Sequence, residues 1–427
     1  MGLKTDSICV QGGWEPKNGE PRMLPIYQST TFRYETSEEM GALFDLEKEG
    51  YFYTRLANPT CDLVASKICE LEGGVAAMLT SSGQAATLMA VTNISQAGDH
   101  VICSAKCYGG TSNLLTVTLK RFGLEVTLVD PDASEEEIAA QFRPNTKAVF
   151  AETISNPAGV VLDIEKFVKL AHDHGVPMIC DNTFATPINC RPFEWGVDIV
   201  THSTTKYMDG HAMAVGGAIV DSGNFDWDAH ADKFPGLTTP DESYHGIIYT
   251  QKFGKMAYIQ KAVAQLMRDL GACQSPQNAF LTNIGLETLH LRVPRHCENA
   301  EKVAAFLKNH PKVEWVDYAG LPGDKYYDLA QKYMPHGTCG VLCFGPKGGK
   351  EGGMQFTNHL KMVAIATHVA DAKSCVLHPA SHTHRQLSDE QLVEAGVLPD
   401  LIRLSVGIEN VEDIIADLDQ ALNSIEI

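Results

Sequence analysis

Residues 197–207 read VDIVTHSTTKY, and this stretch decides the fold. It begins as a mostly apolar run of strand length and ends in hydroxyl side chains and a lysine, Lys206. Similar apolar runs occupy 75–80, 100–104, 124–130, 147–153, 176–181 and 215–220. Helical spacing separates most of these runs, as in 84–95 and 164–174. Strands that are apolar on both faces and alternate with helices predict an α/β fold, with a mostly parallel sheet flanked by helices.

The rest of the chain departs from this alternation. Residues 1–60 are rich in turn residues and aromatics and have little periodicity, so we expect an irregular arm. The loop KFPGLTTPDESYHG at 233–246 precedes a long helical stretch that reaches about residue 295. Beyond it, a smaller α+β unit is predicted from helices at 298–308 and 411–422 and strands at 313–316 and 340–344. The expected units are an arm at 1–60, a larger domain at 61–275 and a C-terminal domain at 276–427.

The composition excludes several classes of protein. The net charge is 34 − 53 = −19 with His neutral, and an acidic surface repels phosphate backbones, so no nucleic-acid partner is expected. No stretch approaches about 18 consecutive apolar residues and the N-terminus has no apolar signal core, so neither membrane binding nor secretion is expected. The twelve cysteines include no C-x-x-C pair, which favours free thiols in the cytoplasm.

Three strand ends carry residues of complementary chemistry, at the edge where parallel sheets bind ligands. The sequence SSGQ at 81–84 follows one strand and opens a helix, which suits a phosphate, although a plain N-cap explains it as well. Asp181 ends another strand, where it would either cap a turn or pair with a protonated ring nitrogen. Lys206, between an apolar strand and the glycines of HAMAVGG, is placed to be a desolvated amine that forms an imine. Ser203 and Thr205 flank it at a spacing that suits one phosphate.

Two other patterns are weaker candidates for a site. HPASHTH contains His378, His382 and His384, but no carboxylate or thiolate is spaced to complete a metal site, so we expect a structural loop and no metal. FGPKGGKEGG has Glu351 where a phosphate loop requires Ser or Thr, which indicates a flexible turn.

The chain resembles the Cys/Met-metabolism family of pyridoxal-phosphate (PLP) enzymes, and most of all its O-acetylhomoserine sulfhydrylase branch. The motifs that carry this resemblance are LPIYQSTTF (24–32), YTRLANPT (53–60), LEGG (71–74), SSGQAA (81–86), YGGT (108–111), ETISNP (152–157), DNTFATP (181–187), HSTTKY (202–207), GLTTPDESYHG (236–246), DAKSCVLHPASHTH (371–384) and RLSVGIE (403–409). They run in order through almost the whole chain, which makes the resemblance specific.

The resemblance implies the PLP-dependent transferase fold of type I, with pyridoxal 5'-phosphate as cofactor. It implies that Lys206 is the Schiff-base lysine, that Asp181 pairs with the pyridinium and that Tyr108 stacks on the ring, these three being the catalytic residues. The other implied cofactor-binding residues are Ser82, Gly83, Gln84, Asn156, Thr183, Ser203 and Thr205, with Tyr53 and Arg55 supplied by a neighbouring subunit. Arg403 is implied to bind the substrate carboxylate, assisted by Ser374 and Asn156. The implied active unit is a homo-oligomer, at least a dimer and usually a tetramer.

The implied reaction is γ-replacement, in which sulfide displaces acetate from O-acetylhomoserine and gives homocysteine. A lyase of the same family, of the methionine γ-lyase or cystathionine type, is the alternative. Gly110 in YGGT and the insertion FPGLTTPDESYHG favour replacement over elimination. A third hypothesis, an inactive cofactor-holding or metal-binding protein, is disfavoured because Lys206, Asp181, Tyr108 and Arg403 are all present.

Several residues depart from the family's commoner ones. Glycine is common at Ser155, Asp209, Ala212 and Ala370, Asn at His368, an aliphatic residue at Cys375 and Thr at His382. Because the neighbourhoods of Lys206 and Ser374 are implied to line the substrate side, these departures suggest an altered substrate or sulfur-donor preference.

Overall fold

The computed structural model describes residues 2–157, 159–383, 385 and 397–426. Its larger sheet has seven strands in the order β1-β7-β6-β5-β4-β2-β3. Their bounds are β1 Ala76–Thr80, β2 His100–Ser104, β3 Glu125–Val129, β4 Thr146–Glu152, β5 Met178–Asp181, β6 Ile199–His202 and β7 Gly217–Asp221. The five strands from β6 to β3 are parallel, and β7 is antiparallel to both β6 and β1. The predicted, mostly parallel α/β sheet is therefore confirmed.

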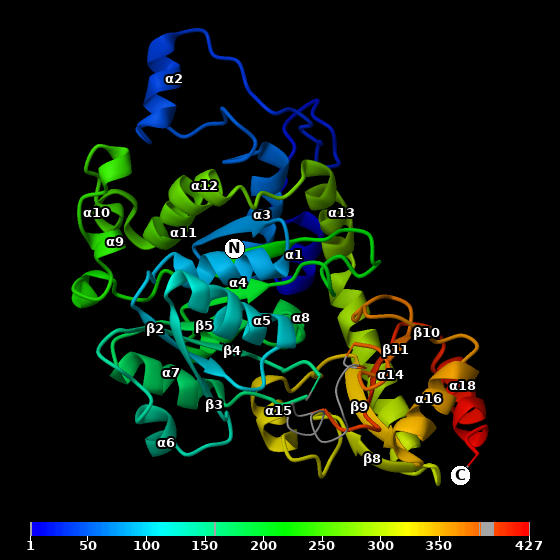
Figure 1. The fold of residues 1–427 in the computed structure, drawn as a ribbon. Coiled ribbons are helices and arrows are strands. Elements are labelled where there is room, and N and C mark those ends of the chain that lie inside the picture. Colours follow the sequence, from blue (N-terminus) through cyan, green and yellow to red (C-terminus); the bar gives the residue numbers. More distant parts are fainter. Residues whose placement is uncertain (1, 158, 384, 386–396, 427) are drawn as a thin grey trace.

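Helices with clear start signals pack against this sheet (Figure 1). They are α3 (Pro59–Glu72), α4 (Gly83–Thr92) and α7 (Ile164–Asp173). Asn58 caps α3 and is followed by Pro59 at the first helical position, while Ser82 caps α4. Shorter helices lie between the strands or beside them: α5 Gly109–Asn113, α6 Glu135–Ala139, α8 Thr186–Asn189 and α9 Pro235–Thr238.

The smaller sheet has five strands in the order β10-β11-β12-β9-β8, antiparallel except for the pair β10 and β11. Its strands are β8 Val313–Asp317, β9 Val341–Pro346, β10 Ala364–Ile365, β11 Cys375–Leu377 and β12 Ile402–Ser405. The helices of this part are α14 Leu289–Lys308, α15 Tyr327–Tyr333, α16 Gly349–His359 and α18 Val411–Asn423. Residues such as Phe344, Phe356 and Leu418 form a separate core between this sheet and its helices, as an α+β unit requires.

The long helical stretch predicted up to residue 295 is broken. It contains α10 (Tyr249–Phe253), α11 (Ala257–Lys261), a π-helical turn, α12 (Arg268–Leu270) and α13 (Pro276–Glu287). Gly271 ends α12 with φ of +71°, a conformation that glycine adopts without strain, and Ser275 caps α13. The helix expected at 298–308 starts earlier, at Leu289, and continues through Pro294.

The expectation that residues 1–60 are irregular is wrong at two places, where the structure has the helices α1 (Thr5–Gln11) and α2 (Ser37–Phe44). Each has too few turns to give a clear hydrophobic period. Helix α1 buries Ile8 and Cys9 against α3 and α13, so the first residues belong to the body of the molecule. Helix α2 stands away from the large sheet, beyond α10 and α12 (Figure 1).

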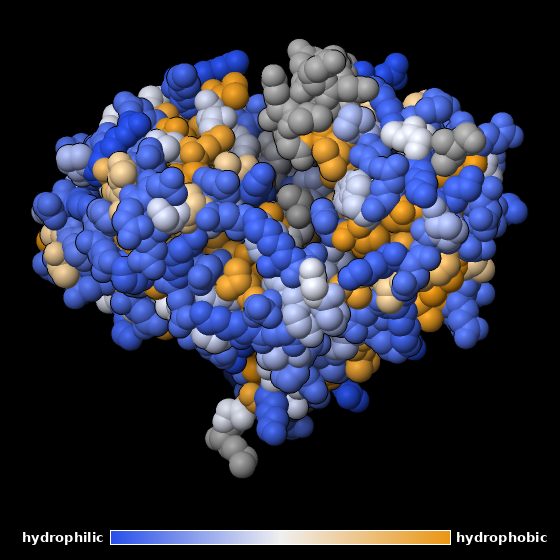
Figure 2. All heavy atoms as spheres, turned by 90° about the horizontal axis from the view of Figure 1, so that it is seen from below, coloured by the Kyte–Doolittle hydropathy of each residue, from blue (hydrophilic) through white to orange (hydrophobic). Residues whose placement is uncertain are grey.

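The face of the molecule drawn in Figure 2 is mostly hydrophilic, with hydrophobic residues in small patches. Among the described helices, none is long and apolar enough to cross a membrane. All twelve cysteines are free thiols.

Candidate active site

A cavity of about 220 Å³ lies where β4, β5 and β6 of the large sheet end, and the small sheet closes it through Arg403 of β12. Most of the predicted site residues line this cavity: Ser82, Gly83, Gln84, Tyr108, Asn156, Asp181, Thr183, Ser203, Thr205, Lys206 and Arg403. Residues more than 300 positions apart in the chain thus meet in one cavity. It lies at the edge of the large sheet where the parallel strands end, as the sequence predicts for Asp181 and Lys206.

One end of the cavity is built for an anion. Helix α4 points its N-terminus here, and Ser82 caps it by accepting a hydrogen bond from the Ala85 amide at 3.1 Å. Only glycine fits at position 83, because a Cβ there would lie 2.6 Å from the Cβ of Ser203. This close approach brings the hydroxyl of Ser203 beside the free amides of the first helical turn, an arrangement that binds phosphate. Thr205 lines the same cavity, and its hydroxyl also exchanges hydrogen bonds with the backbone of Gly216 at 3.1 Å.

Two carboxylates, the buried Glu152 and the partly buried Asp181, end neighbouring strands on the other side of the cavity. Asp181 of β5 accepts a hydrogen bond from the Thr183 amide at 2.9 Å. Glu152 of β4, its partner across the sheet, accepts from the amides of Tyr108 at 2.6 Å and Asn156 at 3.3 Å. Burial raises the pKa of both carboxyl groups, and for Glu152 the neighbouring charge of Asp181 acts in the same direction. A protonated ring nitrogen beside Asp181 would favour its ionised form.

Glu152 was not among the predicted site residues. A signal was nevertheless present in the sequence, because Glu152 is the next-to-last residue of the apolar run 147–153, much as Asp181 ends the run 176–181. It fixes the backbone of two other cavity residues, Tyr108 and Asn156. Tyr108 itself precedes α5 and is 47% exposed, so its ring is accessible from the cavity mouth.

Lys206 follows β6 and extends its amine into the cavity. Burial, together with the positive charge of Arg403, lowers the pKa of Lys206 to about 8. About a tenth of the amine is therefore neutral near pH 7, far more than for an ordinary lysine, and the neutral form is the nucleophile that attacks a carbonyl carbon. The Nζ atom lies 3.5 Å from Nδ1 of His368. The sequence singled out His368 only because Asn is the commoner residue there in the family.

Arg403 is a buried cation without a carboxylate partner among the described residues. It is 7% exposed, and its Nη1 donates to Oδ1 of Asn156 at 3.2 Å while Nη2 donates to the Thr367 carbonyl at 3.1 Å. Its Nε is buried and has no hydrogen-bond partner in the described protein. No salt bridge within the described part of the chain therefore holds this side chain. A guanidinium in this state fits a small carboxylate.

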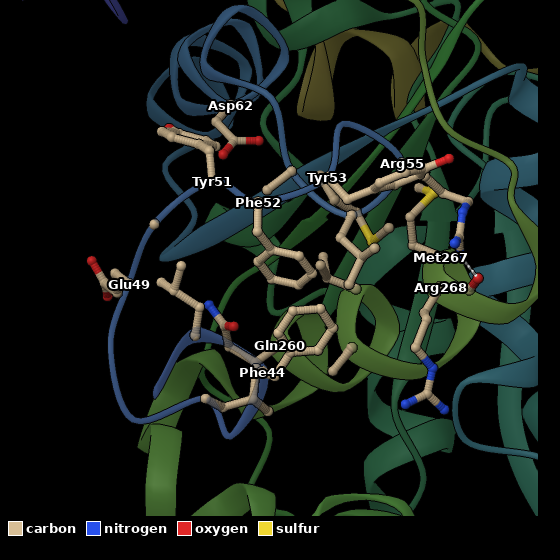
Figure 3. Close-up of a pocket in the computed structure, with 18 of the residues that line it drawn as sticks. Phe44, Glu49, Tyr51, Phe52, Tyr53, Arg55, Asp62, Gln260, Met267 and Arg268 are labelled. Carbon is tan, nitrogen blue, oxygen red and sulfur yellow. Dashed lines mark hydrogen bonds between the residues drawn. The ribbon is translucent and has the colours of Figure 1, made fainter. Parts of the chain in front are cut away.

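Three predicted site residues do not line this cavity. Ser374 is 1% exposed, and its hydroxyl donates to Glu409 at 2.9 Å and accepts from the Gly407 amide at 2.9 Å. Tyr53 and Arg55 lie in a separate hollow of about 1420 Å³ between the segment 31–62 and the helices from α10 to α12 (Figure 3). There the Arg55 guanidinium lies over the Tyr53 ring and donates to the Arg268 carbonyl.

The histidine loop forms hydrogen bonds within the protein. The ring nitrogens of His378 contact the Ser381 hydroxyl at 2.7 Å and the Pro399 carbonyl at 2.8 Å. The described residues contain no group of three or more His, Cys, Asp or Glu placed to hold a metal. His384 lies outside the described residues.

Comparisons with known proteins give the family. A family model described as Cys/Met metabolism PLP-dependent enzyme matches residues 6–423. Homocysteine synthase of Schizosaccharomyces pombe is 44% identical over 98% of this chain and 97% of its own length. O-acetyl-L-homoserine sulfhydrylase of Leptospira meyeri is 43% identical over 99% of this chain and 97% of its own.

A solved structure has the same fold over its whole length. It is that of a putative O-acetylhomoserine (thiol)-lyase of Campylobacter jejuni with N'-pyridoxyl-lysine-5'-monophosphate, and it matches with a TM-score of 0.95 and 38% identity, covering 99% of this chain and 100% of its own. The predicted PLP-dependent transferase fold is confirmed, and the chain belongs to the Cys/Met metabolism family of PLP-dependent enzymes.

Proposed function

We propose that this chain is an O-acetylhomoserine sulfhydrylase that uses PLP to replace the acetoxy group on the γ-carbon of O-acetyl-L-homoserine with sulfide or a thiol. The products are acetate and homocysteine, or methionine when the donor is methanethiol, which places the enzyme in methionine biosynthesis. The observation that carries the proposal is the convergence on one cavity of an amine with a lowered pKa (Lys206), a carboxyl group at a strand end (Asp181) and a guanidinium without a carboxylate partner among the described residues (Arg403). Full-length relatives of the same activity support it.

The cavity residues fit the cofactor in charge and in shape. We assign its phosphate to the α4 N-terminus and the neighbouring hydroxyls, its ring nitrogen to Asp181, its ring hydroxyl to Asn156 and its ring face to Tyr108. The residues assigned to the phosphate are Ser82, Gly83, Gln84, Ser203 and Thr205. Thr183 positions a residue at each end of the assigned cofactor site. Its amide donates to Asp181, and its hydroxyl accepts a hydrogen bond from the Ser203 amide at 2.8 Å. When bound, PLP supplies an electron sink that stabilises negative charge on a substrate carbon.

The protein's own groups supply binding and proton transfer. Arg403 binds the substrate α-carboxylate through its guanidinium and so fixes the α-carbon near Lys206. The neutral Nζ of Lys206 takes the proton from the α-carbon and later a proton from the β-carbon. Loss of acetate then opens the γ-carbon to the sulfur nucleophile, and Nζ returns the protons. Ser374 acts indirectly in this scheme, by positioning the segment next to Arg403 through Glu409 and Gly407.

We further propose that Tyr53 and Arg55 complete the phosphate site of a neighbouring subunit, so that the active unit is at least a dimer and, by analogy with the family, a tetramer. Their position in a hollow that shares no lining residue with the Lys206 cavity supports this proposal. Twelve free thiols fit a reducing compartment, and we place the enzyme in the cytoplasm.

The test is an incubation of the purified enzyme and PLP with O-acetylhomoserine, with and without sulfide, in which homocysteine and α-ketobutyrate are assayed together. We expect homocysteine that requires both sulfide and Lys206, so Lys206→Ala should abolish it, whereas the exposed-lysine control Lys120→Ala should not. α-Ketobutyrate as the main product in the presence of sulfide would instead assign a γ-lyase.

A further inference from the structure

One carboxylate holds two of the residues that line the cavity. Glu152 is the last residue of β4 and is 8% exposed. Its Oε1 accepts a hydrogen bond from the Tyr108 amide at 2.6 Å, and its Oε2 accepts one from the Asn156 amide at 3.3 Å. A single side chain therefore fixes both the segment that precedes α5 and the segment that follows β4.

The contact with Asn156 continues to Arg403. The side-chain oxygen of Asn156 accepts a hydrogen bond from Nη1 of Arg403 at 3.2 Å, so the contacts cross from the large sheet to β12 of the small sheet. The other printed acceptors of this guanidinium are the carbonyls of Thr367 and His368. Neutral oxygens thus set its orientation within the described protein. Because Glu152 holds the backbone of Asn156, it also limits where the guanidinium lies.

The loop of Tyr108 has a second tether. Two residues further on, the Gly110 carbonyl accepts a hydrogen bond from Nε2 of Gln84 at 3.0 Å. Gln84 belongs to the first turn of α4, at the anion-binding end of the cavity. The position of Tyr108 therefore depends on two backbone tethers, whereas the contact with Glu152 is the one that reaches the Asn156 amide.

An acid is a costly residue at this place in the fold. Burial and the neighbouring Asp181 raise the pKa of Glu152, and only the amides of Tyr108 and Asn156 lower it. A glutamine of the same size would avoid the buried charge. It has one oxygen and one NH₂ group, however, and the NH₂ group cannot accept from a backbone amide. A carboxylate is thus the group that holds both residues at once.

We propose that Glu152 is a positioning residue for the substrate, which acts through Asn156 to orient Arg403 toward the substrate carboxylate. This inference rests on the proposed function, which assigns that carboxylate to Arg403. Glu152 transfers no proton in this role and forms no covalent bond. Its effect is on the geometry of Arg403, so it should govern how strongly the enzyme prefers an amino acid to an amine without a carboxylate.

The variant Glu152→Gln releases one of the two amides. Because the bond to Tyr108 is 2.6 Å long and the bond to Asn156 is 3.3 Å, we expect the glutamine oxygen to stay with Tyr108 and its NH₂ group to face the Asn156 amide. The control is Glu136→Gln, which makes the same change at an exposed glutamate.

The test compares two ligands that differ only in a carboxylate. L-norvaline and n-butylamine share the amine and the carbon chain, and the absorbance of the PLP-loaded enzyme reports the dissociation constant (Kd) of each. In the wild type we expect the Kd of n-butylamine to exceed that of L-norvaline by about 100-fold. In Glu152→Gln this ratio should fall about tenfold, through a higher Kd of L-norvaline, while Glu136→Gln should keep the wild-type ratio.

A double-mutant cycle checks the route through Asn156. Asn156→Ala should also lower the ratio, and adding Glu152→Gln to it should lower the ratio no further, because the two changes interrupt the same chain of contacts. Losses that multiply would overturn the proposal. Glu152→Asp guards against a folding defect of the glutamine variant. Its side chain is one CH₂ group shorter and cannot reach both amides, so the ratio should again fall.

Hydrogen exchange of the apoprotein supplies a readout without cofactor. With ¹⁵N-labelled asparagine, the Asn156 amide should exchange at least about tenfold faster in Glu152→Gln than in the wild type. An unchanged exchange rate would overturn the proposal. Faster exchange with an unchanged Kd ratio would also overturn it, because Glu152 would then stabilise only the local backbone.

Arg403→Gln separates this inference from the proposed function. A Kd ratio that persists in Arg403→Gln would refute the assignment of the carboxylate to Arg403, and the inference with it. A ratio that is lost in Arg403→Gln but kept in Glu152→Gln would refute the inference alone. The assay uses neither sulfide nor an acetylated substrate, so its result does not depend on the sulfhydrylase activity.

Discussion

Lys206 is the residue whose environment sets the working pH of the site. Burial, and then Arg403, lowers its pKa to about 8, so the neutral fraction of the amine rises about tenfold per pH unit below 8 and levels off above it. The rate at which the apoprotein captures PLP, followed by absorbance in stopped flow, should therefore rise through pH 6–8 and then reach a plateau. In Arg403→Gln the midpoint should move to higher pH, because the positive charge that lowers the pKa of Lys206 is lost. A rate that keeps rising toward pH 10 in the wild type would contradict this.

At two of the positions where the chain departs from its family, the backbone conformation explains why glycine is the commoner residue. Ala212 and Ala370, where glycine is common, have φ of +55° and +64°, a region in which a Cβ is strained. Ala212 is exposed, so Ala212→Gly removes strain without leaving a cavity. We expect it to stabilise the protein by about 1 kcal/mol, seen as a higher Tm in calorimetry. Ala105→Gly, at an exposed site without positive φ, should be neutral or destabilising, and equal shifts would argue against strain.

At the level of elements, a buried acid joins helix α3 to the strand ends that carry the site. Glu72, the last residue of α3, accepts hydrogen bonds from Asn182, after β5, at 2.9 Å and from His202, at the end of β6, at 2.6 Å. Glu72→Ala would leave Nε2 of His202 and one N–H of the Asn182 amide buried without this acceptor, so we expect a loss of about 3 kcal/mol of unfolding free energy in urea. Glu70→Ala, on the exposed side of the same helix, should cost little. Similar losses for the two variants would contradict a role for the network.

The individual strands and helices also show which parts of the fold could be predicted from the sequence and which could not. Each strand of the large sheet coincides with an apolar run, because strands buried on both faces need continuous hydrophobic sequence. That β7 runs antiparallel was not predictable from composition. It follows from the connection 203–216, which carries Lys206 and is too irregular to be the helical crossover that a parallel strand needs. Helix α1 was missed because its seven residues bury only Ile8 and Cys9.

The whole molecule shows why the site was only partly predictable. Asp181 ends β5 and Lys206 closely follows the neighbouring strand β6 of the same sheet, so their proximity follows from the fold. The contacts of Arg403 with Asn156 and of His368 with Lys206 instead join the two sheets, and no local pattern predicts them. The assignment of separate domains at 61–275 and 276–427 stays a prediction. Each sheet lies within one of these ranges, but the core of the large sheet also includes residues beyond 275, such as Val293 and Met334.

The last prediction concerns the assembly. If Tyr53 and Arg55 serve the site of a neighbouring subunit, Lys206→Ala and Arg55→Ala are defects on different chains of one site. Unfolding and refolding an equal mixture of the two inactive variants should then restore activity. Half of the dimers are mixed, and each has one site with both defects and one intact site, so about a quarter of the wild-type activity is expected. The double variant Lys206→Ala/Arg55→Ala, mixed with Lys206→Ala, is the control and should stay inactive. Activity no greater than the sum of the separate variants would mean that Arg55 acts within its own chain, and the hollow in which it lies would then need another explanation.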